Sequence, residues 1–208
     1  MEDTGPSRSL SPGPPGTQGT RMAFNLPNLL TYSRILAVPA IVLCFSFPGD
    51  MARWAALAVF VIAAVTDWLD GYFARAWSQQ SALGRMLDPI ADKLLVSIVL
   101  LLLVGKETIA GPDIWAAVII LSREILVSGL REFLADLRVS IPVSRLAKWK
   151  TGVQLAALGL LIPGTAADTI VPGAGITGII ALWLAALFTV VTGYDYLKAG
   201  IIKLMKEG

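Results

Sequence analysis

The chain has 208 residues, 55% of them hydrophobic, and a mean hydropathy of +0.70. Its formal net charge of +2 is too small to favour nucleic-acid binding. It has no histidine and one cysteine, Cys44, so an intrachain disulfide is excluded and any transfer chemistry must use carboxylates, hydroxyls or lysines.

The first segment, residues 1–20, is rich in Pro, Gly, Ser and Thr, a composition that cannot bury a core. We predict a disordered N-terminal tail over 1–20 and one catalytic transmembrane domain over 21–208. Within that domain, residues 21–29 are expected to form a short lead-in at the membrane interface.

Six apolar stretches follow, and most approach the roughly 20 residues that a membrane-spanning helix needs. They cover residues 29–48, 52–76, 84–104, 112–134, 147–162 and 175–197. Helix breakers separate them, including Pro48-Gly49, Gly111-Pro112, Pro142, Pro163-Gly164 and Pro172-Gly173. The fifth stretch is short, so its helix is expected to begin upstream. This pattern predicts an all-α integral membrane protein with six transmembrane helices; the alternative is a soluble all-helical protein with buried core helices.

Basic residues are distributed unequally between the predicted loops, which indicates the orientation in the membrane. The outer loops contain only Arg53 and Lys106, among four acidic residues. With the N-terminus inside, the inner segments contain Arg8, Arg21, Arg75, Arg85, Arg138, Arg145, Lys148, Lys198, Lys203 and Lys206. Both termini are therefore predicted to face the cytoplasm, in a multi-pass protein of the cell membrane.

Four aspartates lie where the second and third stretches meet, in the sequence DWLDGYFARAWSQQSALGRMLDPIADK. Asp67 and Asp70 are three residues apart and share one helix face. Asp88 and Asp92 are four residues apart and share a face of the next helix. A tight antiparallel pair would direct all four carboxylates to one point, although charges inside membrane helices are costly.

Ionised carboxylates that share a low-dielectric pocket require cations to neutralise them. Oxygen ligands without Cys or His favour Mg²⁺ or Mn²⁺, and two such ions would suit a pyrophosphate substrate. The pattern therefore predicts a two-metal site at the four aspartates. Gly71, Ala74 and Gly84 lack bulk and would let a ligand approach the helices, and Arg75 could pair with phosphate.

A structural role is the alternative for these aspartates. They could cap helix ends, as Pro89 after Asp88 suggests, or pair with Arg75, Arg85 and Lys93. Capping accounts for one aspartate but leaves the other three unexplained.

The spacing Asp67-x2-Asp70-Gly71-x2-Ala74-Arg75-x8-Gly84-x3-Asp88-x3-Asp92 resembles the signature of the CDP-alcohol phosphatidyltransferase family at all eight fixed positions. This resemblance implies that Asp67, Asp70 and Asp88 bind the metals. It implies that Asp92 completes the metal site and is the base for the attacking hydroxyl. The residues that would line the site for the CDP moiety are Gly71, Ala74, Arg75 and Gly84. The resemblance also implies a homodimer.

Over residues 24–197 the chain is similar to bacterial family members that transfer a phosphatidyl group from CDP-diacylglycerol to glycerol 3-phosphate. The stretches that carry this similarity include FNLPNLLTYSRI, SREILVSGLREFLAD and AKWKTGVQ. Other acceptors within the family remain alternatives: phosphatidylglycerol, an inositol phosphate or serine. A cation transporter and a non-catalytic scaffold are the alternatives outside it.

A phosphorylated acceptor needs several cations that converge on its phosphate. The candidates are Arg34, Arg123, Arg131, Lys148 and Lys150. Glu124 and Glu132 can offset part of this charge, but the two lysines are expected to remain. The alternative is that the Arg-Glu pairs are structural and that the lysines are cytoplasmic anchors.

Overall fold

The computed structural model describes residues 26–77, 82–137 and 145–207, and all regular structure in these ranges is helical. The all-α prediction is therefore confirmed. The predicted tail, residues 1–20, lies outside the described residues. The predicted lead-in lies only partly inside them, because the first described helix begins at Leu26, earlier than the apolar stretch at 29.

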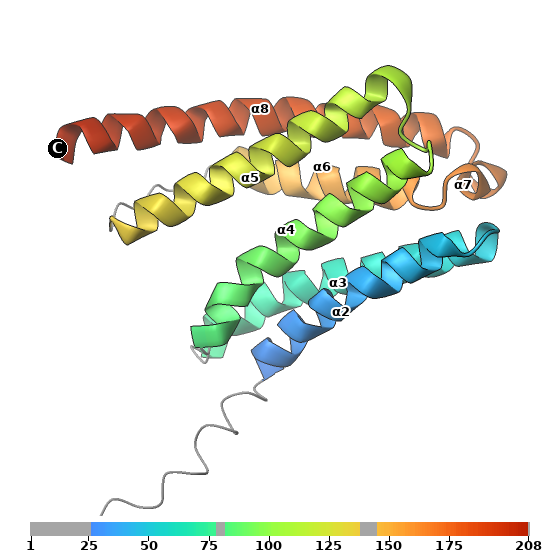
Figure 1. Ribbon diagram of the computed structural model, residues 1–208, viewed down its shortest axis with the longest axis horizontal. Helices are drawn as coiled ribbons and strands as arrows, with labels where there is room; N and C mark the ends of the chain where they lie inside the picture. Colours follow the sequence, from blue (N-terminus) through green and yellow to red (C-terminus); the bar gives the residue numbers. More distant parts are fainter. Residues whose placement is uncertain (1–25, 78–81, 138–144, 208) are drawn as a thin grey trace, which may run out of the picture.

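Each of the six apolar stretches corresponds to one long helix (Figure 1). The long helices are α2 (Leu26–Ser46), α3 (Asp50–Trp77), α4 (Ala82–Gly105), α5 (Ile114–Asp136), α6 (Arg145–Leu161) and α8 (Ala174–Glu207). A 3₁₀ turn, η1 (Gly111–Asp113), precedes α5, and a short helix, α7 (Thr165–Ile170), follows α6. As expected, α6 begins upstream of its apolar stretch.

The Pro-Gly breakers mark helix boundaries. Gly49 has φ +101° immediately before α3, and Gly173 has φ +85° immediately before α8. Side chains other than glycine rarely adopt such positive φ values, so these positions stop one helix and reorient the chain for the next. Pro142 lies outside the described residues.

The long helices form two groups (Figure 1). In the first group, α2 packs against α3 and α4; in the second, α8 packs against α5 and α6. Contacts between the groups are sparser and join α4 to α5 and α6, and α3 to α6. We call this boundary the seam.

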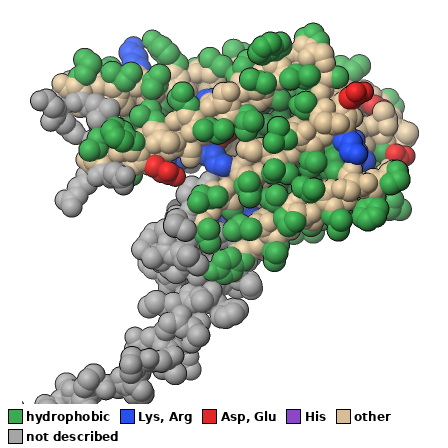
Figure 2. All heavy atoms as spheres, viewed as in Figure 1, with side chains coloured by type: hydrophobic (Ala, Val, Ile, Leu, Met, Phe, Trp, Pro, Cys, Tyr) green, Lys and Arg blue, Asp and Glu red, His purple; other side chains and the backbone are tan. Residues whose placement is uncertain are grey.

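One apolar core runs through both groups. It includes Ile41 and Phe60 in the first group and Ile120, Leu158 and Leu182 in the second, all at most 2% exposed. The outward faces of the helices are also apolar: Leu36, Trp115 and Leu187 are among many large hydrophobic residues that are more than half exposed. Hydrophobic side chains are spread over the whole described part of the face drawn in Figure 2, where charged side chains are sparse.

Only one helix in the described ranges is long and apolar enough by itself to cross a membrane. It covers Ala174–Lys203, with a mean hydropathy of 2.2 in its most apolar window. Tyr32–Ser46 and Lys93–Gly105 form shorter apolar helices. Charges interrupt other stretches, as Arg123 and Glu124 do in α5. Six transmembrane helices therefore stay a prediction.

The connections after α2, α4 and α6 meet at one end of the molecule, which we call the loop end. All three contribute to a cavity of about 750 Å³ there. Arg53 lies at this end: it donates to the carbonyl of Ile162 at 3.2 Å and to Thr108 at 3.5 Å, and its guanidinium lies 4.4 Å from the ring centre of Phe45. The long helices thus alternate in direction, as the order of predicted spans requires.

Candidate active site

The aspartate signature lies on the adjoining ends of α3 and α4. Asp70 is seven residues before the end of α3 at Trp77, and Asp88 is six residues after the start of α4 at Ala82. At about 1.5 Å of rise per residue, both lie about 10 Å along their helices from the connection. The backbone therefore places the two aspartate pairs at matching depths, which the predicted site requires.

The side chains of the eight signature residues lie outside the described part of the structure. Among the described side chains, no group of three or more His, Cys, Asp or Glu is placed to bind a metal ion. The fit to a metal therefore rests on the donor set and its backbone positions. Four carboxylates on two adjoining helix ends are suitable ligands for a hard divalent cation.

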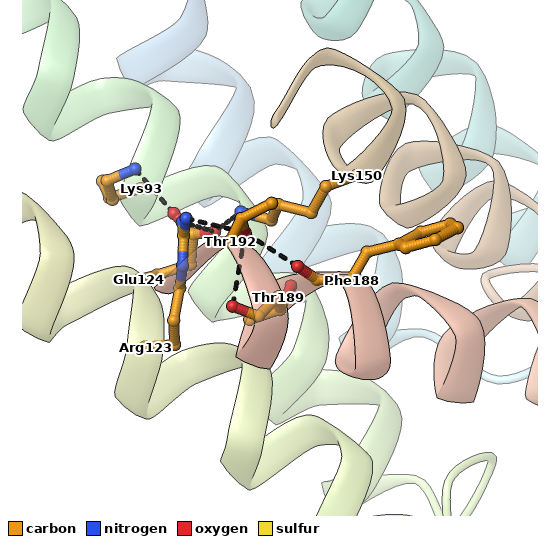
Figure 3. Close-up of polar contacts among 7 residues, drawn as sticks. All are labelled: Lys93, Arg123, Glu124, Lys150, Phe188, Thr189 and Thr192. Carbon is orange, nitrogen blue, oxygen red and sulfur yellow. Dashed lines mark hydrogen bonds and ion pairs between the residues drawn. The ribbon is translucent and has the colours of Figure 1, made fainter. Parts of the chain in front are cut away.

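A partly buried polar cluster crosses the seam beside the helix ends that carry the aspartate signature (Figure 3). Its centre is Glu124, midway along α5 and 6% exposed. Lys93 of α4 donates to Glu124 Oε2 at 2.6 Å, and Lys150 of α6 donates to Oε1. Arg123 also donates to Oε1, at 3.5 Å. One carboxylate therefore holds three cations from three helices.

Arg123 extends the cluster to α8. Its Nη2 donates to Thr192 Oγ1 at 3.1 Å, and the Thr192 hydroxyl donates to the carbonyl of Phe188 at 2.7 Å. The neighbouring Gly193 leaves room for this arginine, because an added Cβ would lie 3.0 Å from Arg123 Cγ. The position of the guanidinium is therefore defined by contacts from both α5 and α8.

The predicted acceptor residues are only partly brought together. Arg123 and Lys150 meet at Glu124, whereas Arg131 is exposed farther along α5, with its guanidinium 5.7 Å from the ring centre of Tyr196. Arg34 is buried on α2, at 2% exposure, and no contact between described residues joins it to Glu124. The side chain of Lys148 lies outside the described part.

One expectation about charge was wrong, and one residue was missed. Lys150 does not remain without an acid, because α5 and α6 both pack against α8 and Lys150 reaches Glu124 across the space between them. Lys93 was considered only as a partner for the aspartates, yet it pairs with a glutamate 31 residues away. A basic residue next to Asp92 was the available signal, but its partner depends on how α4 and α5 pack.

The described helices, their aspartate-bearing ends and the cations at the seam agree with the all-helical fold that the family resemblance implies. Residues 24–191 match the profile of the CDP-alcohol phosphatidyltransferase family, and the chain belongs to this family.

Curated proteins similar to this chain in sequence share one name. A protein of Rickettsia felis is 48% identical over 179 residues, covering 86% of this chain and 97% of its own length. A protein of Haemophilus influenzae is 40% identical over 85% of this chain and 94% of its own length. A protein of Cereibacter sphaeroides is 36% identical over 89% of this chain and 100% of its own length. Each is named CDP-diacylglycerol–glycerol-3-phosphate 3-phosphatidyltransferase.

Proposed function

We propose that this chain transfers the phosphatidyl group of CDP-diacylglycerol to glycerol 3-phosphate, giving phosphatidylglycerophosphate and CMP. The observation that carries this proposal is the nearly full-length similarity to relatives named for this reaction, at up to 49% identity. The half-buried Arg123 and the buried Lys150 at the seam support an anionic acceptor, because charge-assisted bonds from Arg and Lys suit a phosphate.

The proposed chemistry centres on the aspartate signature. Asp67, Asp70, Asp88 and Asp92 would hold two Mg²⁺ or Mn²⁺ ions, which when bound neutralise charge on the pyrophosphate and the leaving phosphate. Asp92 accepts the proton of the acceptor hydroxyl, whose oxygen bonds to the phosphorus attached to diacylglycerol. The bond from that phosphorus to CMP breaks, and CMP leaves with the electron pair.

The acceptor phosphate is proposed to bind Arg123, Arg131, Lys148 and Lys150, with Arg34 as a further cation. Arg123 and Lys150 are already held near each other by Glu124, so little ordering is needed when the phosphate binds. Arg131 is eight residues from Arg123, about 12 Å along the helix, so it would contact another part of the acceptor or its path of entry.

An acceptor panel tests this proposal. The purified protein is given CDP-diacylglycerol and one alcohol at a time: glycerol 3-phosphate, serine, phosphatidylglycerol or an inositol phosphate. CMP release is expected with glycerol 3-phosphate. It should be at least about tenfold slower with serine, which has no phosphate, since the loss of one charge-assisted bond costs about 1.5–3 kcal/mol. CMP release with serine or phosphatidylglycerol but not with glycerol 3-phosphate would refute the acceptor assignment while leaving the family intact.

A cell-membrane location with six spans and both termini in the cytoplasm is also proposed. The exposed hydrophobic residues on the outward helix faces support it, because soluble monomers rarely expose such extensive apolar surface. The common position of the connections after α2, α4 and α6 agrees with alternating spans.

Cysteine labelling on a Cys44→Ser background tests the orientation. A reagent that cannot cross the membrane should label a cysteine at position 168 from outside intact cells, because α7 lies at the loop end and Asp168 is exposed. A cysteine at position 145, at the start of α6, should react only after permeabilisation. The reverse pattern would contradict the orientation and the supply of substrates from the cytoplasm.

A further inference from the structure

Glu124 occupies an unusual position for a charged residue. It is buried midway along α5, and both of its carboxylate oxygens accept bonds from cations. Burial of a carboxylate is costly unless the charge is compensated, and here Lys93, Arg123 and Lys150 compensate it. The same contacts fix the relative positions of the three cations.

The contacts of Glu124 join the two helix groups. Lys93 belongs to α4 in the first group, and it follows Asp92 directly in the chain. Arg123 and Lys150 belong to the second group, on α5 and α6. Contacts across the seam are otherwise sparse, so the bond between Lys93 and Glu124 directly links the aspartate-bearing helix to the acceptor cations (Figure 3).

We propose that Glu124 is a positioning residue that holds Arg123 and Lys150 at a fixed distance from α4, and that Lys93 is its anchor on that helix. This proposal rests on the proposed function, since it concerns where the bound acceptor lies relative to Asp92. A displacement of about 1 Å between reacting groups can lower a rate about a hundredfold. In this proposal the bond between Lys93 and Glu124 fixes the position of the acceptor cations relative to Asp92.

Lys93→Met is the first test, because it removes the anchor and leaves Glu124, Arg123 and Lys150 together. Catalytic turnover at saturating substrates is expected to fall about tenfold to a hundredfold, while the KM for glycerol 3-phosphate stays within about threefold. The rate is taken per folded protein, with thermal unfolding in detergent as the measure of folding. A purely structural lysine would lower the melting temperature but leave turnover per folded protein unchanged, and that result would overturn the proposal.

A double-mutant cycle then asks whether Lys93 acts through Glu124 or through the adjacent Asp92. Adding Lys93→Met to Glu124→Gln should cost less than about threefold in turnover, because the link is already broken. If Lys93→Met costs as much in the Glu124→Gln background as in the wild type, the proposal is wrong. Glu132→Gln is the matched control: Glu132 is an exposed glutamate on the same helix, and its removal should leave turnover and KM unchanged.

CMP release by the wild-type protein distinguishes a failure of this proposal from a failure of the proposed function. If the wild-type protein releases no CMP with glycerol 3-phosphate, the proposed function fails, and the cycle is then read with the acceptor that the protein does use. If it does release CMP but the effect of Lys93→Met does not depend on Glu124, only the positioning role fails.

Discussion

Replacing Asp67, Asp70, Asp88 or Asp92 with Asn, one at a time, is expected to lower CMP release about a thousandfold or more. The change keeps the size of the side chain but removes a charged metal ligand. Loss of several kcal/mol of transition-state stabilisation corresponds to such a factor, because each 1.36 kcal/mol is about tenfold in rate. The measurement is steady-state CMP release at saturating Mg²⁺ or Mn²⁺ and saturating substrates.

Asp50→Asn provides the matched control for these four variants. Asp50 is the first residue of α3, exposed and at the opposite end of the helix that bears Asp67 and Asp70. The Asp50→Asn variant should retain normal turnover. It should lose at most about 0.3–1 kcal/mol of stability, because a negative charge at a helix N-terminus interacts favourably with the helix dipole. Near-normal turnover in two or more of the four signature variants would refute the two-metal mechanism.

Lys150→Gln is expected to raise the KM for glycerol 3-phosphate about tenfold to a hundredfold, since a charge-assisted bond to phosphate contributes about 1.5–3 kcal/mol. The KM for CDP-diacylglycerol should change little, because Lys150 lies with the acceptor cations on α6. Lys150 is 5% exposed and bonds to Glu124, so the variant also disturbs a buried ion pair. Melting in detergent must therefore accompany the kinetic measurement.

Two further variants test whether the change in KM after Lys150→Gln comes from the loss of a charge at this position. Lys150→Arg retains the charge and should keep the KM closer to the wild-type value. Lys106→Gln removes an exposed lysine at the loop end and should leave both KM values unchanged. Equal increases in the KM for both substrates after Lys150→Gln would show that the residue does not serve the acceptor alone.

Much of the fold could be predicted from the sequence because the helices are long and their boundaries carry strong local signals. Pro48-Gly49 and Pro172-Gly173 lie between helices as expected, since positive φ at these glycines is a local property of the chain. Helix α7 was missed: its six residues lie in a segment predicted as a loop, and a helix this short has little periodicity to detect.

The candidate site could be predicted only where its pattern is local. The aspartates at i, i+3 and i, i+4 could be recognised from spacing within two adjoining helices, whereas the partners of Glu124 could not. Lys150 and Lys93 are 26 and 31 residues from Glu124. They meet it only because α4 packs against α5 and because α5 and α6 share α8 as a neighbour. The roles of the site residues and the homodimer stay predictions.

Arg53 links the two helix groups at a second place along the seam. It belongs to α3, yet it donates to the carbonyl of Ile162, the residue after the end of α6, so it ties the two groups at the loop end. The bond between Lys93 and Glu124 ties them midway along the bundle. The two ties lie at different heights along the bundle and add to the apolar packing that the groups share, so a sliding of one group along the other would have to break polar bonds at both heights.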